Sequence, residues 1–164
     1  MKKLWLALWV CAALLPRAAA LSAAAAVTMD ADTGETLFAE NADSRLPMAS
    51  TTKIMTALVA LGEGDLDRVY TVKPEYAAVE GSSMYLEEGE RLTLRDTLYG
   101  LMLSSGNDAA AAVAGECGGE RAFVDKMNAK ARELGLTDTR FENPSGLPSD
   151  GHYTTARELA KITA

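Results

Sequence analysis

The strongest constraint on the fold is a series of short helical segments that glycines separate from one another. Apolar residues recur at the three- and four-residue spacing of one helix face, as with Ile54, Ala57 and Leu58. Glycine follows at 62, 118 and 135, where it favours a helix end. The sequence therefore predicts helices over residues 50–61, 94–103, 108–117 and 120–134.

Other elements flank these helices. Residues 27–30 and 35–39 predict the two strands of a hairpin, because a turn sequence with glycine separates them. The stretch 65–85 contains proline and glycine breakers and predicts only short irregular elements. Thr155 and Glu158 have the spacing of a capping box, which predicts the start of a last helix.

Residues 1–24 have the pattern of a secretory signal peptide. A basic start precedes an apolar run over residues 4–15, and small residues follow it. The run is shorter than the roughly 20 residues that span a bilayer, so an uncleaved anchor is the weaker alternative. We expect cleavage near Ala20 or Ala24, with residues 25–164 as part of one exported domain. Its location would be the periplasm or the extracytoplasmic face of the membrane.

The charge balance and the cysteine count argue against several classes of function. The net charge is −7 and no cluster of basic residues occurs, so we expect no nucleic-acid partner. Cys11 lies in the leader and lacks the small residues of a lipoprotein cleavage site. Without the leader, Cys117 is the remaining cysteine and His152 the single histidine. We therefore expect no disulfide framework, no metal cluster and no cofactor.

Ser50 and Lys53 form the most informative pair. In the pattern Ser-x-x-Lys, the two side chains share one helix face, with Cβ atoms about 5 to 6 Å apart. A serine hydroxyl is a weak nucleophile until a neighbour takes its proton, which a buried lysine can do. The free N–H groups of the helix start would favour the resulting oxyanion. The alternative is that Ser50 only caps the helix and Lys53 is a solvated side chain.

A second motif, Ser105-Gly106-Asn107, lies between two predicted helices. A hydroxyl and an amide at this position can face the first helix from across a cleft. Ser105 would relay a proton to the leaving group, and Asn107 would hold a substrate amide and the lysine side chain. An ordinary turn between helices is the alternative for this motif taken alone.

The two motifs in this order resemble the penicillin-recognising serine enzymes, whose pattern is Ser-x-x-Lys, then Ser-x-Asn, then Lys-Thr-Gly. Within this group of enzymes, the sequence around the motifs is similar to that of the low-molecular-mass D-Ala-D-Ala carboxypeptidases. The similar segments cover nearly all of the chain after the leader and include residues 30–34, 48–58, 98–110, 143–148 and 152–156.

This resemblance implies an α+β fold, in which helices flank an antiparallel sheet and a helical subdomain borders the site. It implies that Ser50 is the acylated nucleophile, Lys53 its proton acceptor, Ser105 a proton relay and Asn107 a substrate-binding residue. The substrate would be a peptidoglycan stem pentapeptide ending in D-Ala-D-Ala. Penicillins and other β-lactams would acylate Ser50 as mimics of that dipeptide.

The chain departs from the family pattern because no Lys-Thr-Gly occurs up to Ala164. The last predicted helix is also cut short there, so we expect a fragment whose later strands are missing. A truncated product with weak or no activity is the alternative. A peripheral membrane association through a later segment stays open.

Two rival functions remain at this stage. The first is an exported peptidoglycan-binding protein that is inactive without the third motif. The second is a class A-like β-lactamase, which needs a deacylating glutamate, and Glu142 lies in the appropriate loop region. His152 is expected to close the loop before the last helix and not to act as a base.

Overall fold

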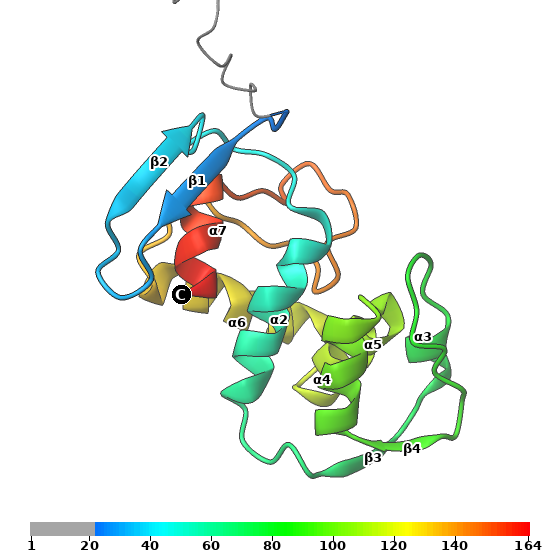
Figure 1. Ribbon diagram of the computed structural model, residues 1–164. Helices are drawn as coiled ribbons and strands as arrows, with labels where there is room; N and C mark the ends of the chain where they lie inside the picture. Colours follow the sequence, from blue (N-terminus) through cyan, green and yellow to red (C-terminus); the bar gives the residue numbers. More distant parts are fainter. Residues whose placement is uncertain (1–21) are drawn as a thin grey trace, which may run out of the picture.

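The computed structural model describes residues 22–164, so the predicted signal peptide and its uncleaved alternative lie almost entirely outside the described residues. The boundary at residue 24 stays a prediction. Within the described part, no helix is long and apolar enough to cross a membrane. Figure 1 shows a strand hairpin with α7 at one end of the molecule and a group of helices at the other.

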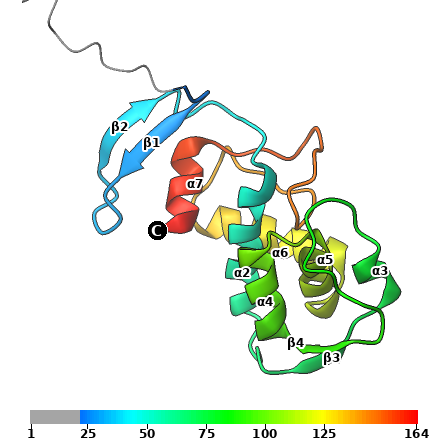
Figure 2. The ribbon, with the colours of Figure 1, turned by 45° about the vertical axis from the view of Figure 1, so that its right-hand side comes forward.

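The predicted hairpin is present, displaced by about one residue. Strands β1 (Ala26–Met29) and β2 (Thr36–Glu40) pair in antiparallel register, with an irregularity at the turn end of the ladder. Asp30 shapes the turn, because its carboxylate accepts hydrogen bonds from the backbone N–H groups of Asp32 and Thr33. Helix α7 (Ala156–Thr163) packs against β1, which brings the first and last elements of residues 22–164 together (Figures 1 and 2).

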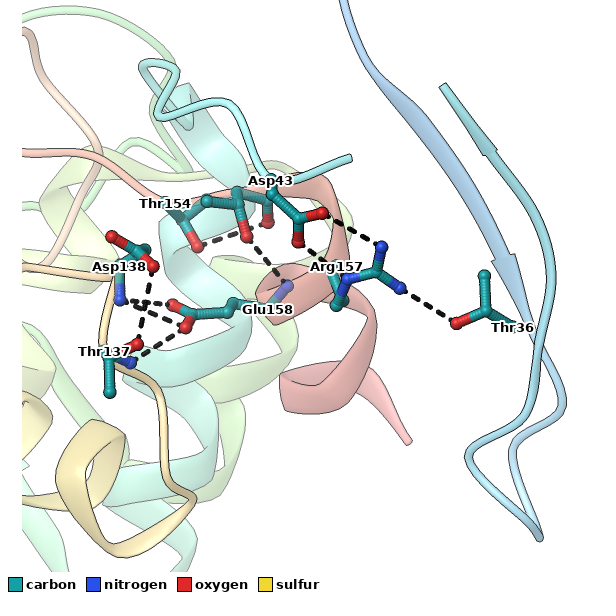
Figure 3. A network of polar contacts seen from close by, with 8 residues as sticks. Thr36, Asp43, Thr137, Asp138, Thr154, Arg157 and Glu158 are labelled. Atoms are coloured by element: carbon teal, nitrogen blue, oxygen red, sulfur yellow. Dashed lines mark hydrogen bonds and ion pairs between the residues drawn. The ribbon is translucent and has the colours of Figure 1, made fainter. Parts of the chain in front are cut away.

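Helix α7 begins as predicted, but its capping differs. Thr155 accepts a hydrogen bond from the backbone N–H of Glu158 at 3.1 Å, which is one half of a capping box. The Glu158 carboxylate accepts instead from the N–H groups of Thr137 at 2.8 Å and Asp138 at 3.1 Å (Figure 3). It also accepts a hydrogen bond from the Thr139 hydroxyl. Glu158 therefore fastens the segment after α6 to α7, a contact that the local pattern does not encode.

Arg157, on the same helix, faces the hairpin. Its guanidinium pairs with Asp43 at 2.7 Å and donates to the Thr36 hydroxyl of β2 at 2.9 Å (Figure 3). Because Asp43 is largely exposed, we expect this ion pair to orient the helix more than to stabilise it.

The predicted helices are all present, with ends that agree to within about two residues. A 3₁₀ turn, η1 (Ala49–Thr51), leads directly into α2 (Thr52–Leu61). The other three are α4 (Leu94–Leu103), α5 (Asn107–Glu116) and α6 (Glu120–Glu133). The alanine-rich α5 contacts α2, α4 and α6, and its small side chains allow this close packing.

The stretch 65–85, predicted to form only short irregular elements, contains one strand of a second, shorter antiparallel pair, and the partner strand follows after it. Strands β3 (Val69–Thr71) and β4 (Arg91–Thr93) pair in antiparallel register, and the one-turn helix α3 (Pro74–Ala77) lies between them in sequence. Strands of three residues are too short for an alternating pattern to be recognised. The α+β class is therefore confirmed in an incomplete form, and the described part of the chain has two small antiparallel sheets with packed helices.

Candidate active site

Ser50 lies in the turn that opens α2, and Lys53 follows in the first turn of that helix. The Nζ atom of Lys53 is 3.2 Å from Ser50 Oγ, which agrees with the proximity predicted from their spacing. The two side chains differ in exposure: Ser50 is open to solvent, whereas Lys53 is only 2% exposed. A hydroxyl that a substrate can reach, beside an amine that can take its proton, is one arrangement that activates a serine nucleophile.

Burial controls the charge of the amine. Desolvation penalises the ammonium form and lowers the pKa of Lys53 below its ordinary value of 10.5. The hydrogen-bond partners of Nζ are Ser50 Oγ, Asn107 Oδ1 at 2.8 Å and the backbone oxygen of Ser145 at 2.7 Å, none of which carries a charge. The neutral form, which can take a proton, is therefore more accessible than in a solvated lysine.

Asn107 is held at the first position of α5. Its N–H donates to the backbone oxygen of Ser82 at 2.7 Å, and its side-chain Nδ2 donates to the backbone oxygen of Glu80 at 2.8 Å. These two bonds turn the Oδ1 atom toward Lys53. The structure therefore brings the second motif against the first.

Ser105 is placed differently from the other three predicted site residues. It lies between α4 and α5 with a φ of 53°, in the left-handed region of backbone conformation that residues other than glycine rarely adopt. The hydrogen bonds of Lys53 go to Ser50, Asn107 and Ser145, so the Ser105 hydroxyl is not among its partners. A backbone held in this region indicates a local constraint beside the site.

Sequence reasoning named the loop that contains residues 143–152 but did not assign its Ser145 carbonyl to the site. Every residue carries a backbone carbonyl, so no pattern could have indicated this one. Within the loop, His152 Nε2 lies 2.7 Å from Thr52 Oγ1, and Nδ1 accepts from the N–H of Glu142 at 3.0 Å. The hydrogen bonds of the His152 ring thus fasten the loop to α2, and Ser50 is not among its partners.

The carboxylate of Glu142 is not among the hydrogen-bond partners of the Lys53 amine. Its carboxylate accepts hydrogen bonds from the Ser149 hydroxyl and from the N–H of Gly151 at 3.2 Å, and it pairs with Arg140 at 3.3 Å. All these partners belong to the same loop region. These contacts therefore do not favour Glu142 as a deacylating glutamate, because they do not include Ser50 or Lys53.

A hollow of about 490 Å³ adjoins the residue before the nucleophile. Residues 45–49 line one side of it, and residues 146–150 with His152 and Tyr153 line the other. A larger hollow, of about 610 Å³, lies between β1 and α7 and contains none of the predicted site residues. The smaller hollow reaches Ala49, but none of the four predicted site residues lines it either. We therefore define the candidate active site by the hydrogen bonds that join Lys53 to Ser50, Asn107 and Ser145.

Comparisons with known proteins converge on one family. A family profile described as D-alanyl-D-alanine carboxypeptidase matches residues 12–164. The D-alanyl-D-alanine carboxypeptidase DacF of Bacillus subtilis is 45% identical over 145 residues, which cover 84% of this chain. The crystal structure of the D-alanyl-D-alanine carboxypeptidase DacD from Francisella tularensis superposes with a TM-score of 0.83 at 39% identity over 87% of the chain. That of a D-alanyl-D-alanine carboxypeptidase from Mycobacterium tuberculosis gives 0.82 at 38% identity over 85% of the chain.

The chain is shorter than these relatives. It spans 37% of the Bacillus protein, 36% of the Francisella chain and 53% of the Mycobacterium chain. The matched part contains the two motifs and the loop that supplies the Ser145 carbonyl.

Proposed function

Because this chain belongs to the D-alanyl-D-alanine carboxypeptidase family, we propose that the whole protein is a serine-type D-Ala-D-Ala carboxypeptidase. Its substrate would be a peptidoglycan stem pentapeptide, from which it removes the terminal D-Ala. β-Lactams would be covalent inhibitors. The observation that carries the proposal is the contact of the buried Lys53 amine with both Ser50 and Asn107.

The proposed reaction begins with transfer of the Ser50 hydroxyl proton to the neutral Lys53 amine. The Ser50 oxygen forms a bond to the carbonyl carbon of the penultimate D-Ala, and the N–H groups at the start of α2 favour the oxyanion. The C–N bond then breaks and the leaving D-Ala amine takes up a proton, for which Ser105 would be the relay. Water hydrolyses the Ser50 ester and regenerates the hydroxyl. Asn107 would orient the substrate amide.

Export to the periplasm or to the extracytoplasmic face of the membrane is part of the same proposal. It is supported by the leader pattern of residues 1–24, and peptidoglycan lies in that compartment. The acidic net charge of −7 agrees with a partner other than nucleic acid. Peripheral attachment to the membrane through a further segment of the protein is also part of the proposal.

The test compares the purified protein with its Ser50→Ala variant after incubation with a penicillin. Intact mass should give one adduct on the wild type and none on Ser50→Ala, and peptide mapping should place it on Ser50. Ser44→Ala, an exposed serine on the approach to the motif, is the matched control and should keep the adduct. The wild type and Ser44→Ala should release D-Ala from a stem pentapeptide, and Ser50→Ala should not.

Absence of an adduct on a wild type that circular dichroism finds folded would refute the acyl-enzyme mechanism. The peptidoglycan-binding protein would then be favoured. A transient adduct with rapid penicillin turnover would favour the β-lactamase instead.

A further inference from the structure

The geometry points to Thr56 as a positioning residue: by fixing the segment that carries the Ser145 carbonyl, it aims the lone pair of Lys53 at Ser50. This inference rests on the proposed function for its catalytic meaning. The contacts on which it depends are independent of any substrate.

The argument starts from the hydrogen-bonding capacity of an amine. Protonated Lys53 has three N–H donors, which match the three acceptors Ser50 Oγ, Asn107 Oδ1 and the Ser145 oxygen. The neutral amine keeps two donors and gains one lone pair. The oxygens of Asn107 and Ser145 can only accept, so both donors go to them, and the lone pair is left facing the Ser50 hydroxyl.

The Ser145 carbonyl is therefore a required member of this pair of acceptors. With Asn107 alone, the neutral amine could rotate about its Cε–Nζ bond and donate to Ser50, which would leave no lone pair for the hydroxyl proton. Two acceptors at 2.8 and 2.7 Å remove that freedom.

Thr56 holds the peptide unit next to this carbonyl. It lies on α2 at 0% exposure, and its hydroxyl donates to the backbone oxygen of Pro144 at 2.6 Å. On the other side of the carbonyl, the Asn143 side chain accepts from the N–H of Ser145 at 3.2 Å and of Gly146 at 2.7 Å. Thr56 thus fixes to α2 the peptide unit beside this carbonyl, whereas His152 fastens the far end of the loop to Thr52 of the same helix. Asn143 shapes the internal turn of the segment.

Positioning and general loosening predict different results for a Thr56→Val variant, which keeps the shape of the side chain. If the Ser145 carbonyl moves away, the ammonium form loses an acceptor, so the pKa of Lys53 falls further, and the acylation rate at its high-pH plateau also falls. If water enters a loosened site, the pKa of Lys53 rises toward its ordinary value, and the plateau rate is kept.

The experiment measures both quantities. Carbon-13 NMR of labelled lysine, assigned with Lys53→Met, follows the titration of the amine, and a chromogenic penicillin reports the acylation rate across a pH series. We expect Thr56→Val to lower the pKa of Lys53. We also expect it to lower the acylation rate at the high-pH plateau by roughly 10- to 100-fold. Thr56→Ser restores the donor and should restore both quantities. Thr97→Val, which removes a buried hydroxyl from α4 instead, should leave both unchanged.

An unchanged or raised pKa of Lys53 in Thr56→Val would overturn the inference, as would an unchanged plateau rate. A wild type that forms no adduct would overturn the proposed function separately. The NMR titration would still decide whether Thr56 holds the carbonyl against the amine.

Discussion

Gly146 offers a sharp test of how the loop packs against the nucleophile. Its φ is +91°, and a Cβ atom at this position would lie 1.9 Å from the backbone oxygen of Ala49 and 2.9 Å from Thr52 Oγ1. Ala49 is itself held at a φ of 46°, immediately before Ser50. Because the atom in the way is a backbone oxygen, a side-chain rotation cannot relieve the overlap.

Two terms contribute to the expected cost of Gly146→Ala. An alanine at positive φ costs about 1 to 2 kcal/mol, and forcing an extra carbon into a packed site typically costs about 1 to 3 kcal/mol. We therefore expect the free energy of unfolding to fall by about 2 to 5 kcal/mol. Gly135→Ala is the matched control, because Gly135 has a φ of +69° and no atom within 4 Å of the added carbon. Gly135→Ala should therefore show only the cost of an alanine at positive φ.

Urea unfolding followed by circular dichroism measures both variants. The penicillin acylation rate should fall for Gly146→Ala and stay unchanged for Gly135→Ala, because only the first substitution displaces the backbone before Ser50. Equal losses of stability in the two variants would refute the close approach of the loop to Ala49.

Three further substitutions test other buried polar contacts. Burial lowers the pKa of His152 below its ordinary value of 6.5, although the charge of Glu142 opposes this. The unfolded chain therefore binds the proton more readily, and the wild-type free energy of unfolding should fall as the pH drops below 6.5 toward the folded-state pKa. His152→Gln cannot titrate and should remove this slope in urea unfolding at a series of pH values; a slope that persists would contradict the assignment. Asp108→Asn should cost about 2 to 4 kcal/mol, because the buried carboxylate accepts four hydrogen bonds and an amide cannot; a cost below 1 kcal/mol in urea would contradict this. Glu158→Gln should lower the free energy of unfolding by about 1 to 3 kcal/mol, which thermal unfolding would show as a lower midpoint temperature. An unchanged midpoint would show that α7 is held by its apolar face.

Local structure could be predicted where the cause is local. The spacing of apolar residues and the glycines after them located α4, α5 and α6 to within about two residues, because helix periodicity is a property of neighbouring side chains. The N-terminal hairpin and the N-cap at Thr155 were predictable for the same reason. The β3–β4 hairpin was not, because its strands are short and depend on contacts distant in sequence.

The sequence by itself determined which residues could do the chemistry, since Ser50 and Lys53 meet through helix geometry alone. Only the tertiary structure decided how the amine is held. The Ser145 carbonyl that accepts from Lys53 is chemically the same as every other backbone carbonyl, and its place depends on Thr56, which is far from it in sequence. Burial of Lys53, which lowers its pKa, likewise results from packing by distant segments, and no local pattern can specify that.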